Sequence, residues 1–184
     1  MSVKLKQVFS GKRLDEVHAL YETAFPASEK KPFSMIVSGQ GTGLVEILSL
    51  EENNRFLGLA IMAKAGDRVL LDYFAIADEV RGHGAGSAAL QALRERYQGM
   101  RIIIEIERTK CVDEEELVLR TRRKKFYLRN GFTMLPYYID LWGTEMEMLS
   151  NGQPCPYEEY LDIYTTAFGT KVSDKIHFLG DAPA

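Results

Sequence analysis

The chain has 184 residues, of which 46 % are hydrophobic and 27 % are charged, and its formal net charge is −3. This composition is typical of one globular domain with a substantial core, and the negative charge gives no support to a nucleic-acid partner. The N-terminal sequence MSVKLKQVFSGKRL lacks the apolar core of a signal peptide, and no run is long enough to span a bilayer. We therefore expect a cytoplasmic protein with no nucleic-acid partner and no membrane partner.

Cysteine and histidine are sparse. Cys111 and Cys155 stand far apart, and because nothing indicates secretion we expect both to be reduced thiols. The three histidines, His18, His83 and His177, have no spacing that suits metal ligation. We expect no metal site.

The first third of the chain alternates strand and helix patterns. A strand is predicted over residues 3–8, a helix capped by Ser10 runs to about residue 25, and Pro32 begins a short helix that ends near residue 39. Three strands follow over residues 44–50, 56–64 and 68–76. Short turns separate these strands, which predicts antiparallel hairpins.

The rest of the chain continues the alternation. Helices are predicted over residues 87–97, about 113–130 and 157–168, and strands over residues 101–107, near 138–142 and near 145–149, before a weakly patterned tail. Asp113 and Glu116 have the spacing of a capping box, and Gly131 stands where a left-handed C-cap residue belongs. The pattern predicts a mixed α/β (α+β) fold around one sheet, antiparallel at first and parallel across the segment at residues 81–86.

That segment reads RGHGAG, and it lies between a strand pattern, LLDYFAI, and an alanine-rich helix. Unpaired backbone N–H groups and the helix dipole both favour an anion at a helix N-terminus. Gly82, Gly84 and Gly86 carry no Cβ atom, so a phosphate can approach the main chain closely. The loop therefore predicts a site for a phosphorylated cofactor.

A dinucleotide-binding fold is the first alternative. Residues 84–89 formally satisfy GxGxxA, and Glu105 follows about twenty residues later, where a ribose-binding acid would stand. However, residues 77–81 separate the strand from the glycines, and the unit lies behind antiparallel strands instead of opening the fold. A nucleotide-dependent enzyme of this type is the weaker hypothesis.

Read with its flanks, the segment resembles the signature Gln/Arg-x-x-Gly-x-Gly/Ala of the GNAT superfamily of acetyl-CoA-dependent N-acetyltransferases, bacterial type. The preceding LDYFAI resembles the central strand of that family, and FYLRNGF at residues 126–132 resembles its helix ending in Tyr-x-x-x-Gly-Phe. The resemblance covers residues 1–150 and implies an antiparallel N-terminal meander followed by splayed parallel strands, flanked by helices. Residues 151–184 are expected to form a helical extension of the same domain.

The resemblance implies acetyl-CoA as co-substrate, with no metal. Main-chain bonds to its pantetheine arm would come from Phe74 and Ile76, where the parallel strands splay, and an N–H near Ile76 would face the thioester oxygen. Its diphosphate would bind at the loop residues Arg81, Gly82, His83, Gly84, Ala85, Gly86 and Ser87.

An acceptor amine with a lysine-like pKa near 10.4 arrives mostly as ammonium, so a base or an ordered water must take its proton. Strand alternation places Glu105 opposite the isoleucines at residues 102, 104 and 106, which are expected to face the core. Glu105 occupies the position of an acid in the family's fifth strand and is the first candidate for the base. Asp72 is the competitor, ordered water is the third alternative, and either carboxylate could be only ion-paired.

Tyr127 stands four residues before Gly131, at the position of the family's general-acid tyrosine. A phenol with a pKa near 10 suits a proton donor to the departing thiolate. The structural alternative is that Tyr127 packs in the core as Phe126 does.

The acceptor pocket is expected around residues 25–38 and 136–147. Four acids would make it attractive to a cation, namely Glu22, Glu29, Asp140 and Glu145, and three aromatic residues could stack there, namely Tyr137, Tyr138 and Trp142. The sequence thus predicts transfer of an acetyl group to the primary amine of a small molecule or a protein N-terminus, by direct attack in a ternary complex. A non-catalytic acyl-CoA-binding or regulatory module on the same fold is the alternative, and a homodimer is left open.

Overall fold

The computed structural model describes residues 2–110 and 113–182, so the thiol expected at Cys111 lies outside the described residues. The elements in chain order, with η for 3-10 helices, are β1 (Lys4–Gln7), α1 (Lys12–Ala24), η1 (Ala27–Glu29), α2 (Phe33–Gly41), β2 (Val45–Glu52), β3 (Arg55–Ala65), β4 (Arg68–Ile76), η2 (Asp78–Val80), α3 (Ala85–Arg96), β5 (Arg101–Glu107), α4 (Glu114–Arg129), β6 (Thr133–Leu141), β7 (Thr144–Ser150), α5 (Tyr157–Phe168), α6 (Thr170–Ser173) and β8 (Ile176–Asp181).

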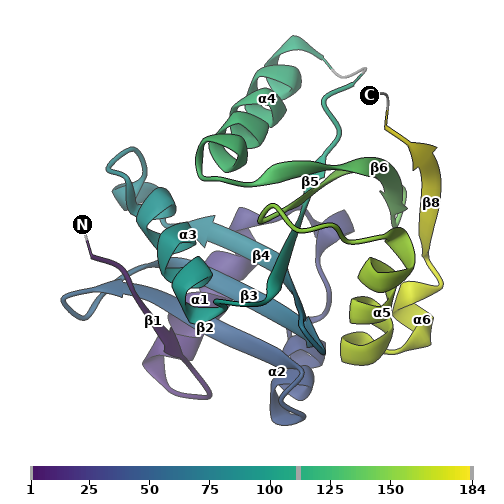
Figure 1. Ribbon diagram of the computed structural model, residues 1–184. Coiled ribbons are helices and arrows are strands. Elements are labelled where there is room, and N and C mark those ends of the chain that lie inside the picture. Colours follow the sequence, from purple (N-terminus) through teal and green to yellow (C-terminus); the bar gives the residue numbers. More distant parts are fainter. Residues whose placement is uncertain (1, 111–112, 183–184) are drawn as a thin grey trace.

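Within the described residues, eight strands form one sheet in the order β1-β2-β3-β4-β5-β7-β6-β8 (Figure 1). Neighbouring strands are antiparallel except for β4 and β5, which are parallel. This arrangement confirms the predicted single mixed sheet, with antiparallel strands first and a parallel pair across the glycine loop.

The parallel pair separates soon after it begins. Only three residue pairs join β4 to β5, and the last of them is Leu70 with Ile103. Beyond this point β4 continues to Ile76 and pairs with β3 alone, while β5 pairs with β7. One edge of β4 over residues 72–76 is therefore not paired with β5, as the predicted splay requires.

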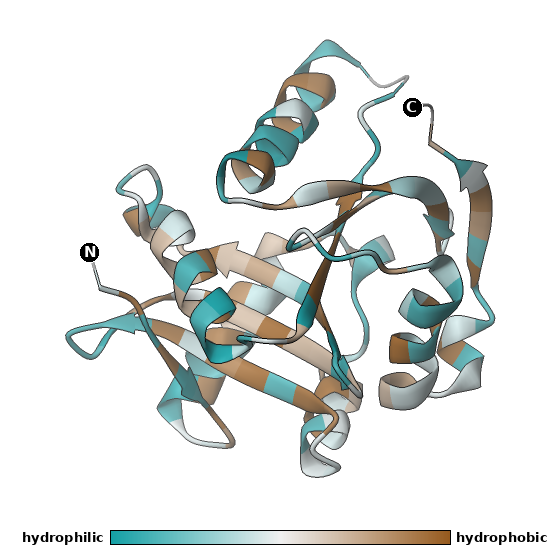
Figure 2. Cartoon of the chain, viewed as in Figure 1, coloured by the Kyte–Doolittle hydropathy of each residue, from teal (hydrophilic) through white to brown (hydrophobic). Residues whose placement is uncertain are grey.

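Helices cover both faces of the sheet (Figure 1), and hydrophobic burial holds them there. On one face α3 packs over β1 and β4 and α4 packs over β5 and β6, with Ala89, Leu90, Leu93 and Tyr127 in a shared core. On the other face α1 and α2 bury Val17, Tyr21 and Ile36. Figure 2 shows hydrophobic colour concentrated on the central strands and extended hydrophilic colour on α4. No helix in the described part of the chain combines the length and apolar character needed to cross a membrane.

Strand β5 is buried on both faces, not only on its isoleucine face. Residues 102, 104 and 106 lie in the core beneath α3, as expected. On the opposite face Ile103 is also fully buried, in a cluster with Tyr160, Ile163 and Tyr164 of α5. Because α5 covers this second face, Glu105 lies under a helix and not on an open surface.

The two ends of α4 form as the sequence predicts. The Asp113 carboxylate accepts a hydrogen bond of 2.9 Å from the backbone N–H of Glu116. At the other end Gly131 has a φ of +82°, and Phe132 N donates to Tyr127 O at 3.2 Å. This 6→1 bond belongs to a Schellman motif, which fixes the last turn of the helix at Tyr127.

Two local predictions differ from the structure. Ser10 is not the N-cap of α1, since Gly11 takes that position, with a φ of +76° and no side-chain cap. The weakly patterned tail contains a strand, β8, which pairs antiparallel with β6. Its sequence escaped detection because Phe178 and Leu179 remain 47 % and 45 % exposed and no alternating apolar face forms. Residues 151–182 thus contribute a strand as well as helices, and a domain limit at residue 150 remains a prediction.

Candidate functional site

A cleft with a volume of about 720 Å³ opens where β4 and β5 separate. Its walls come from the free edge of β4, the loop before α3, β5, and α4, and Lys31, Trp142 and Tyr164 also line it. In the described part of the chain, no three His, Cys, Asp or Glu side chains gather as metal ligands would.

The glycine loop forms one end of this cleft. Gly82 and Gly84 have φ values of +83° and +84°, a left-handed conformation that glycine adopts without strain. Gly84 caps α3, and the first intrahelical bond runs from Ala88 N to Gly84 O at 3.1 Å. The amides of residues 85–87 therefore have no acceptor within the helix. A Cβ atom on Gly82 or Gly84 would meet nothing within 4 Å, so open space lies beside this backbone. Free amides and open space fit an anion such as a diphosphate.

Arg81 and His83 lie differently from the other loop residues. Arg81 folds back, with Nε donating to Ile76 O at 2.9 Å and Nη1 paired to Asp78 at 2.7 Å. His83 does not line the cleft but an adjoining surface groove of about 820 Å³, which shares Gly84 and Ser87 with it. The structure thus gathers the predicted loop residues around one cleft, except for His83.

Phe74 and Ile76 line the cleft from the free edge of β4. Their side chains are partly buried against the core beneath α3, and the Phe74 ring stacks on Phe126 with centroids 6.4 Å apart. The same Phe126 ring lies 3.1 Å from the Cβ that a side chain at Gly86 would carry, so the loop sits close against it. The side chains of Phe74 and Ile76 therefore pack against the core, and their main-chain groups beside the cleft are the ones that could bind a ligand.

Asp72 is the extra residue of a β-bulge. Ile61 lies opposite Tyr73 and Met62 lies opposite Leu71, so Asp72 has no partner on β3. A bulge bends a strand and re-aims its side chains. The Asp72 side chain is only 2 % exposed, and its Oδ1 atom forms an ion pair with Lys31 Nζ at 2.7 Å. Its Oδ2 atom is buried without a hydrogen-bond partner among the described residues.

Lys31 is a buried cation of this site, with a side chain only 3 % exposed. Four aromatic rings surround its ammonium, with centroids 5.0, 4.8, 4.7 and 4.8 Å from Nζ, and they belong to Tyr73, Trp142, Tyr164 and Phe168. Such cation–π contacts gain strength where water is excluded. We call this group the aromatic cage.

Glu105 lies beside the aromatic cage. Its Oε1 accepts a hydrogen bond from the hydroxyl of Tyr160, and its Oε2 accepts one of 3.2 Å from Tyr164. Burial raises the pKa of Glu105 to about 7, and the negative charge of Asp72 acts in the same direction, whereas the Lys31 charge and both tyrosine bonds lower it. A carboxyl group with this pKa can both accept and release a proton at neutral pH.

Tyr127 is 6 % exposed and lines the same cleft as Glu105. Its ring packs between Phe126 and Phe132 at centroid distances of 5.2 and 6.0 Å. Burial raises the pKa of its hydroxyl to about 12, so the phenol keeps its proton at neutral pH. The ring of Tyr127 belongs to the core, as the packing interpretation predicted. The residue also borders the cleft, as a general-acid role requires.

Two of the four acids expected in the acceptor pocket are paired with cations, whereas Glu29 lines the cleft. Glu22 pairs with Lys30 at 2.5 Å, and Glu145 pairs with Arg108 at 2.6 Å. Trp142, expected to stack on an acceptor, lines the cleft and lies against Lys31.

Sequence reasoning missed Lys31, Tyr160 and Tyr164. The one available signal was that the buried face of α5 carries tyrosines, whose hydroxyls need partners when buried.

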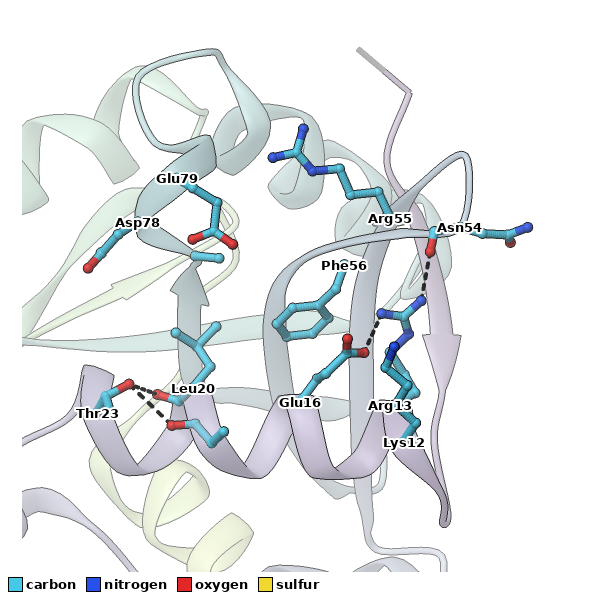
Figure 3. A pocket seen from close by; sticks show the side chains of 12 residues that line it. Lys12, Arg13, Glu16, Leu20, Thr23, Asn54, Arg55, Phe56, Asp78 and Glu79 are labelled. Carbon is cyan, nitrogen blue, oxygen red and sulfur yellow. Dashed lines mark hydrogen bonds and ion pairs between the residues drawn. The ribbon is translucent and has the colours of Figure 1, made fainter.

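A second cavity of about 810 Å³ lies between α1 and the β2–β3 turn (Figure 3). Arg13 is already engaged there, with Glu16 at 2.6 Å and Asn54 O at 2.8 Å. Asp78 and Glu79 add negative charge at one end of this cavity (Figure 3). Lys12 and Arg55 also line it, so cationic and acidic side chains are mixed in this cavity.

The comparisons with known proteins agree with this geometry. The sequence profile of the acetyltransferase (GNAT) domain matches residues 44–134. No curated protein matches the chain by sequence. Among solved structures, a protein from Bacteroides thetaiotaomicron assigned to the GNAT family superposes with a TM-score of 0.76 at 20 % identity, over 91 % of this chain and 99 % of its own.

Two further structures are more distant. An aminoglycoside 6'-N-acetyltransferase complexed with coenzyme A has a TM-score of 0.63 at 11 % identity, covering 83 % of this chain and 99 % of its own. The ribosomal-protein-S18-alanine N-acetyltransferase from Escherichia coli has a TM-score of 0.55 at 17 % identity, covering 85 % and 97 %. The fold is that of the GNAT acetyltransferase structures, and the chain belongs to the GNAT superfamily of acetyltransferases.

Proposed function

We propose that this protein transfers the acetyl group of acetyl-CoA to a primary amine by direct attack in a ternary complex. The observation that supports this most is the single cleft, which runs from the N-terminus of α3 to Glu105. A cofactor site and a base along one cleft are what direct transfer needs, since both substrates must be present together.

In this proposal the amides of residues 85–87 bind the diphosphate of acetyl-CoA, at a helix N-terminus. The main chain of Phe74 and Ile76 pairs with the amides of the pantetheine arm along the free edge of β4. An N–H near Ile76 then stabilises the oxyanion that develops on the thioester.

Glu105 is the proposed base. It takes a proton from the acceptor ammonium, the neutral nitrogen attacks the thioester carbonyl, and the C–S bond breaks. As the C–S bond breaks, Tyr127 gives its proton to the departing thiolate of coenzyme A. The nitrogen releases its second proton to solvent as the amide forms, and Tyr127 regains a proton from solvent. Asp72 is the weaker candidate, because Lys31 already neutralises it and its second oxygen is enclosed.

The acceptor is proposed to be a small-molecule amine or a protein N-terminus, encountered in the cytoplasm. The names of two similar structures include an aminoglycoside and a ribosomal-protein alanine as acetylated groups, which illustrates how widely acceptors vary on this fold. A homodimer remains a prediction of the sequence.

The test is an acetyl-transfer assay with a panel of polyamines, aminoglycosides, amino acids and N-terminal peptides. Release of coenzyme A thiol should depend on one class of amine, and mass spectrometry should detect the acetylated product. Binding of acetyl-CoA without amine-dependent thiol release would favour the non-catalytic module on the same fold.

A further inference from the structure

One part of the cleft lining brings together two carboxylates and one ammonium group from three separate segments. Asp72 comes from β4, Glu105 from β5, and Lys31 from the turn between η1 and α2. Each is buried or half-buried, and Tyr164 of α5 lies 3.2 Å from Glu105 and 3.4 Å from Asp72. Two nearby carboxylates oppose each other's ionisation, so a cation among them changes what both can do.

The main chain of Lys31 is fixed on both sides. Its N–H donates to the hydroxyl of Tyr73 at 2.9 Å, and its carbonyl accepts from the hydroxyl of Tyr21 at 2.7 Å. With the ion pair to Asp72 and the four rings of the aromatic cage, these bonds hold the ammonium in one place. Lys31 is thus a built-in charge of the site and not a surface lysine that happens to reach it.

The ion pair between Lys31 and Asp72 also determines which carboxylate accepts the hydrogen bond from the Tyr164 hydroxyl. That hydroxyl has one hydrogen and two neighbouring carboxylates, so it satisfies only one of them at a time. Because Lys31 Nζ already binds Asp72 Oδ1 at 2.7 Å, the Tyr164 hydrogen is available to Glu105 Oε2, the nearer of the two.

We propose that Lys31 is a positioning residue of the acetyl-transfer site, an inference that rests on the function proposed above. Its caged ammonium neutralises Asp72, directs the Tyr164 hydroxyl to Glu105, and supplies the positive charge that lets Glu105 ionise beside a second carboxylate. Lys31 touches neither substrate in this role and acts through Glu105.

The groups that face Glu105 come from several elements. Asp72 of β4 raises the pKa of Glu105, and Lys31 together with Tyr160 and Tyr164 of α5 lowers it. Tyr137 of β6 also lies close enough that the negative charge of Glu105 helps to raise the pKa of its hydroxyl, after burial. The Lys31 contribution is therefore one of several and must be isolated by substitution.

The substitution Lys31→Met alone does not isolate it, because it would also leave Asp72 without its ion pair beside Glu105. The informative comparison is between Asp72→Asn and the double variant Lys31→Met, Asp72→Asn. Both lack the second carboxylate, and they differ only in the charge at residue 31. Methionine keeps an unbranched apolar chain within the aromatic cage.

The measurement is an NMR titration of the Glu105 side-chain carboxyl carbon, assigned by its loss in Glu105→Gln. The proposal predicts a pKa that is higher in the double variant than in Asp72→Asn by about one unit or more, as expected for losing a nearby cation. Lys31→Arg in the Asp72→Asn background should restore the lower value. Equal pKa values in the two variants, both folded by their NMR spectra, would overturn the proposal.

If the methionine variant does not fold, Lys31→Gln with Asp72→Asn makes the same comparison with a polar neutral side chain. In the transfer assay, the acidic limb of kcat/KM should follow the same order as the titrations. Absence of transfer to any amine would reject the proposed function, while the titrations would still decide whether Lys31 controls the ionisation of Glu105.

Discussion

The carboxyl group of Glu105 makes the stability of the folded protein depend on pH. Its pKa is raised from the ordinary value of 4.5 to about 7, because burial opposes its charge. The folded state therefore binds this proton more tightly than the unfolded chain does. The stability that Glu105 contributes is complete below about pH 4.5 and is lost as the pH rises through about 7.

Glu105→Gln should consequently change stability in a pH-dependent way. The difference between the melting temperatures of the variant and the wild type should become more positive from about pH 5 to about pH 8. Thermal unfolding at a series of pH values tests this. A difference that does not change with pH would mean that Glu105 titrates normally in the folded protein.

The same substitution should lower kcat/KM for the identified acceptor by ~10²–10⁴-fold at neutral pH, the usual contribution of a general base. The loss should shrink at high pH, where more of the amine arrives neutral. Asp72→Asn is the control. If Glu105→Gln leaves the pH–rate profile unaltered and Asp72→Asn shifts it, the role of base passes to Asp72.

Tyr127→Phe separates the two interpretations of Tyr127. The phenylalanine ring keeps the contacts with Phe126 and Phe132, so the melting temperature should change little. Turnover should fall by ~10²–10⁴-fold with acetyl-CoA affinity nearly intact, because the hydroxyl is needed mainly in the transition state. Wild-type turnover would leave Tyr127 with a packing role alone.

At the scale of elements, the N-terminus of α3 provides the most direct test of cofactor binding. Substitutions at Gly84 or Gly86 would disturb the fold, since Gly84 has a positive φ and a Cβ at Gly86 would press on Phe126. Ser87 lines the cleft without either problem, and a negative charge in the first turn favours a helix.

Ser87→Glu should therefore keep or raise the melting temperature while weakening acetyl-CoA binding by about tenfold or more, through repulsion of the diphosphate. Ser87→Ala is the matched control and should bind nearly as the wild type does. Calorimetric titration with acetyl-CoA measures both. Equal acetyl-CoA affinity in the two variants would contradict the proposal that the diphosphate binds at this loop.

Most elements could be predicted from local patterns, and the exceptions have physical causes. The strand and helix periods around the glycine loop, and the cap at Asp113, are properties of neighbouring residues. The bulge at Asp72 could not be predicted, because it depends on the register of β4 against β3. Strand β8 was missed because pairing with β6, and not an apolar face of its own, holds it in place.

At the scale of the whole molecule, the candidate site draws on segments that meet only in the folded chain. The sequence predicted Glu105 and Asp72 because an acid within a strand is costly to bury. Their partners could not be found in the same way, since Tyr160 lies 55 residues from Glu105 and Lys31 lies 41 residues from Asp72. Those contacts follow from how α5 and the turn before α2 pack on the sheet.

Removal of residues 151–184 tests this dependence. Without α5, the buried side chain of Ile103 would be exposed and Glu105 would lose the hydroxyl of Tyr160. We expect a large loss of stability, measured by thermal unfolding, and no acetyl transfer. A truncated protein that unfolds at the wild-type temperature would contradict the view that this segment completes the domain.

The most direct test of the account is a crystal structure with acetyl-CoA bound. We predict the diphosphate at the amides of residues 85–87, the pantetheine along the β4 edge at Phe74 and Ile76, and the thioester carbon facing Glu105. A diphosphate bound elsewhere, such as in the cavity of Figure 3, or a thioester remote from Glu105, would contradict the account.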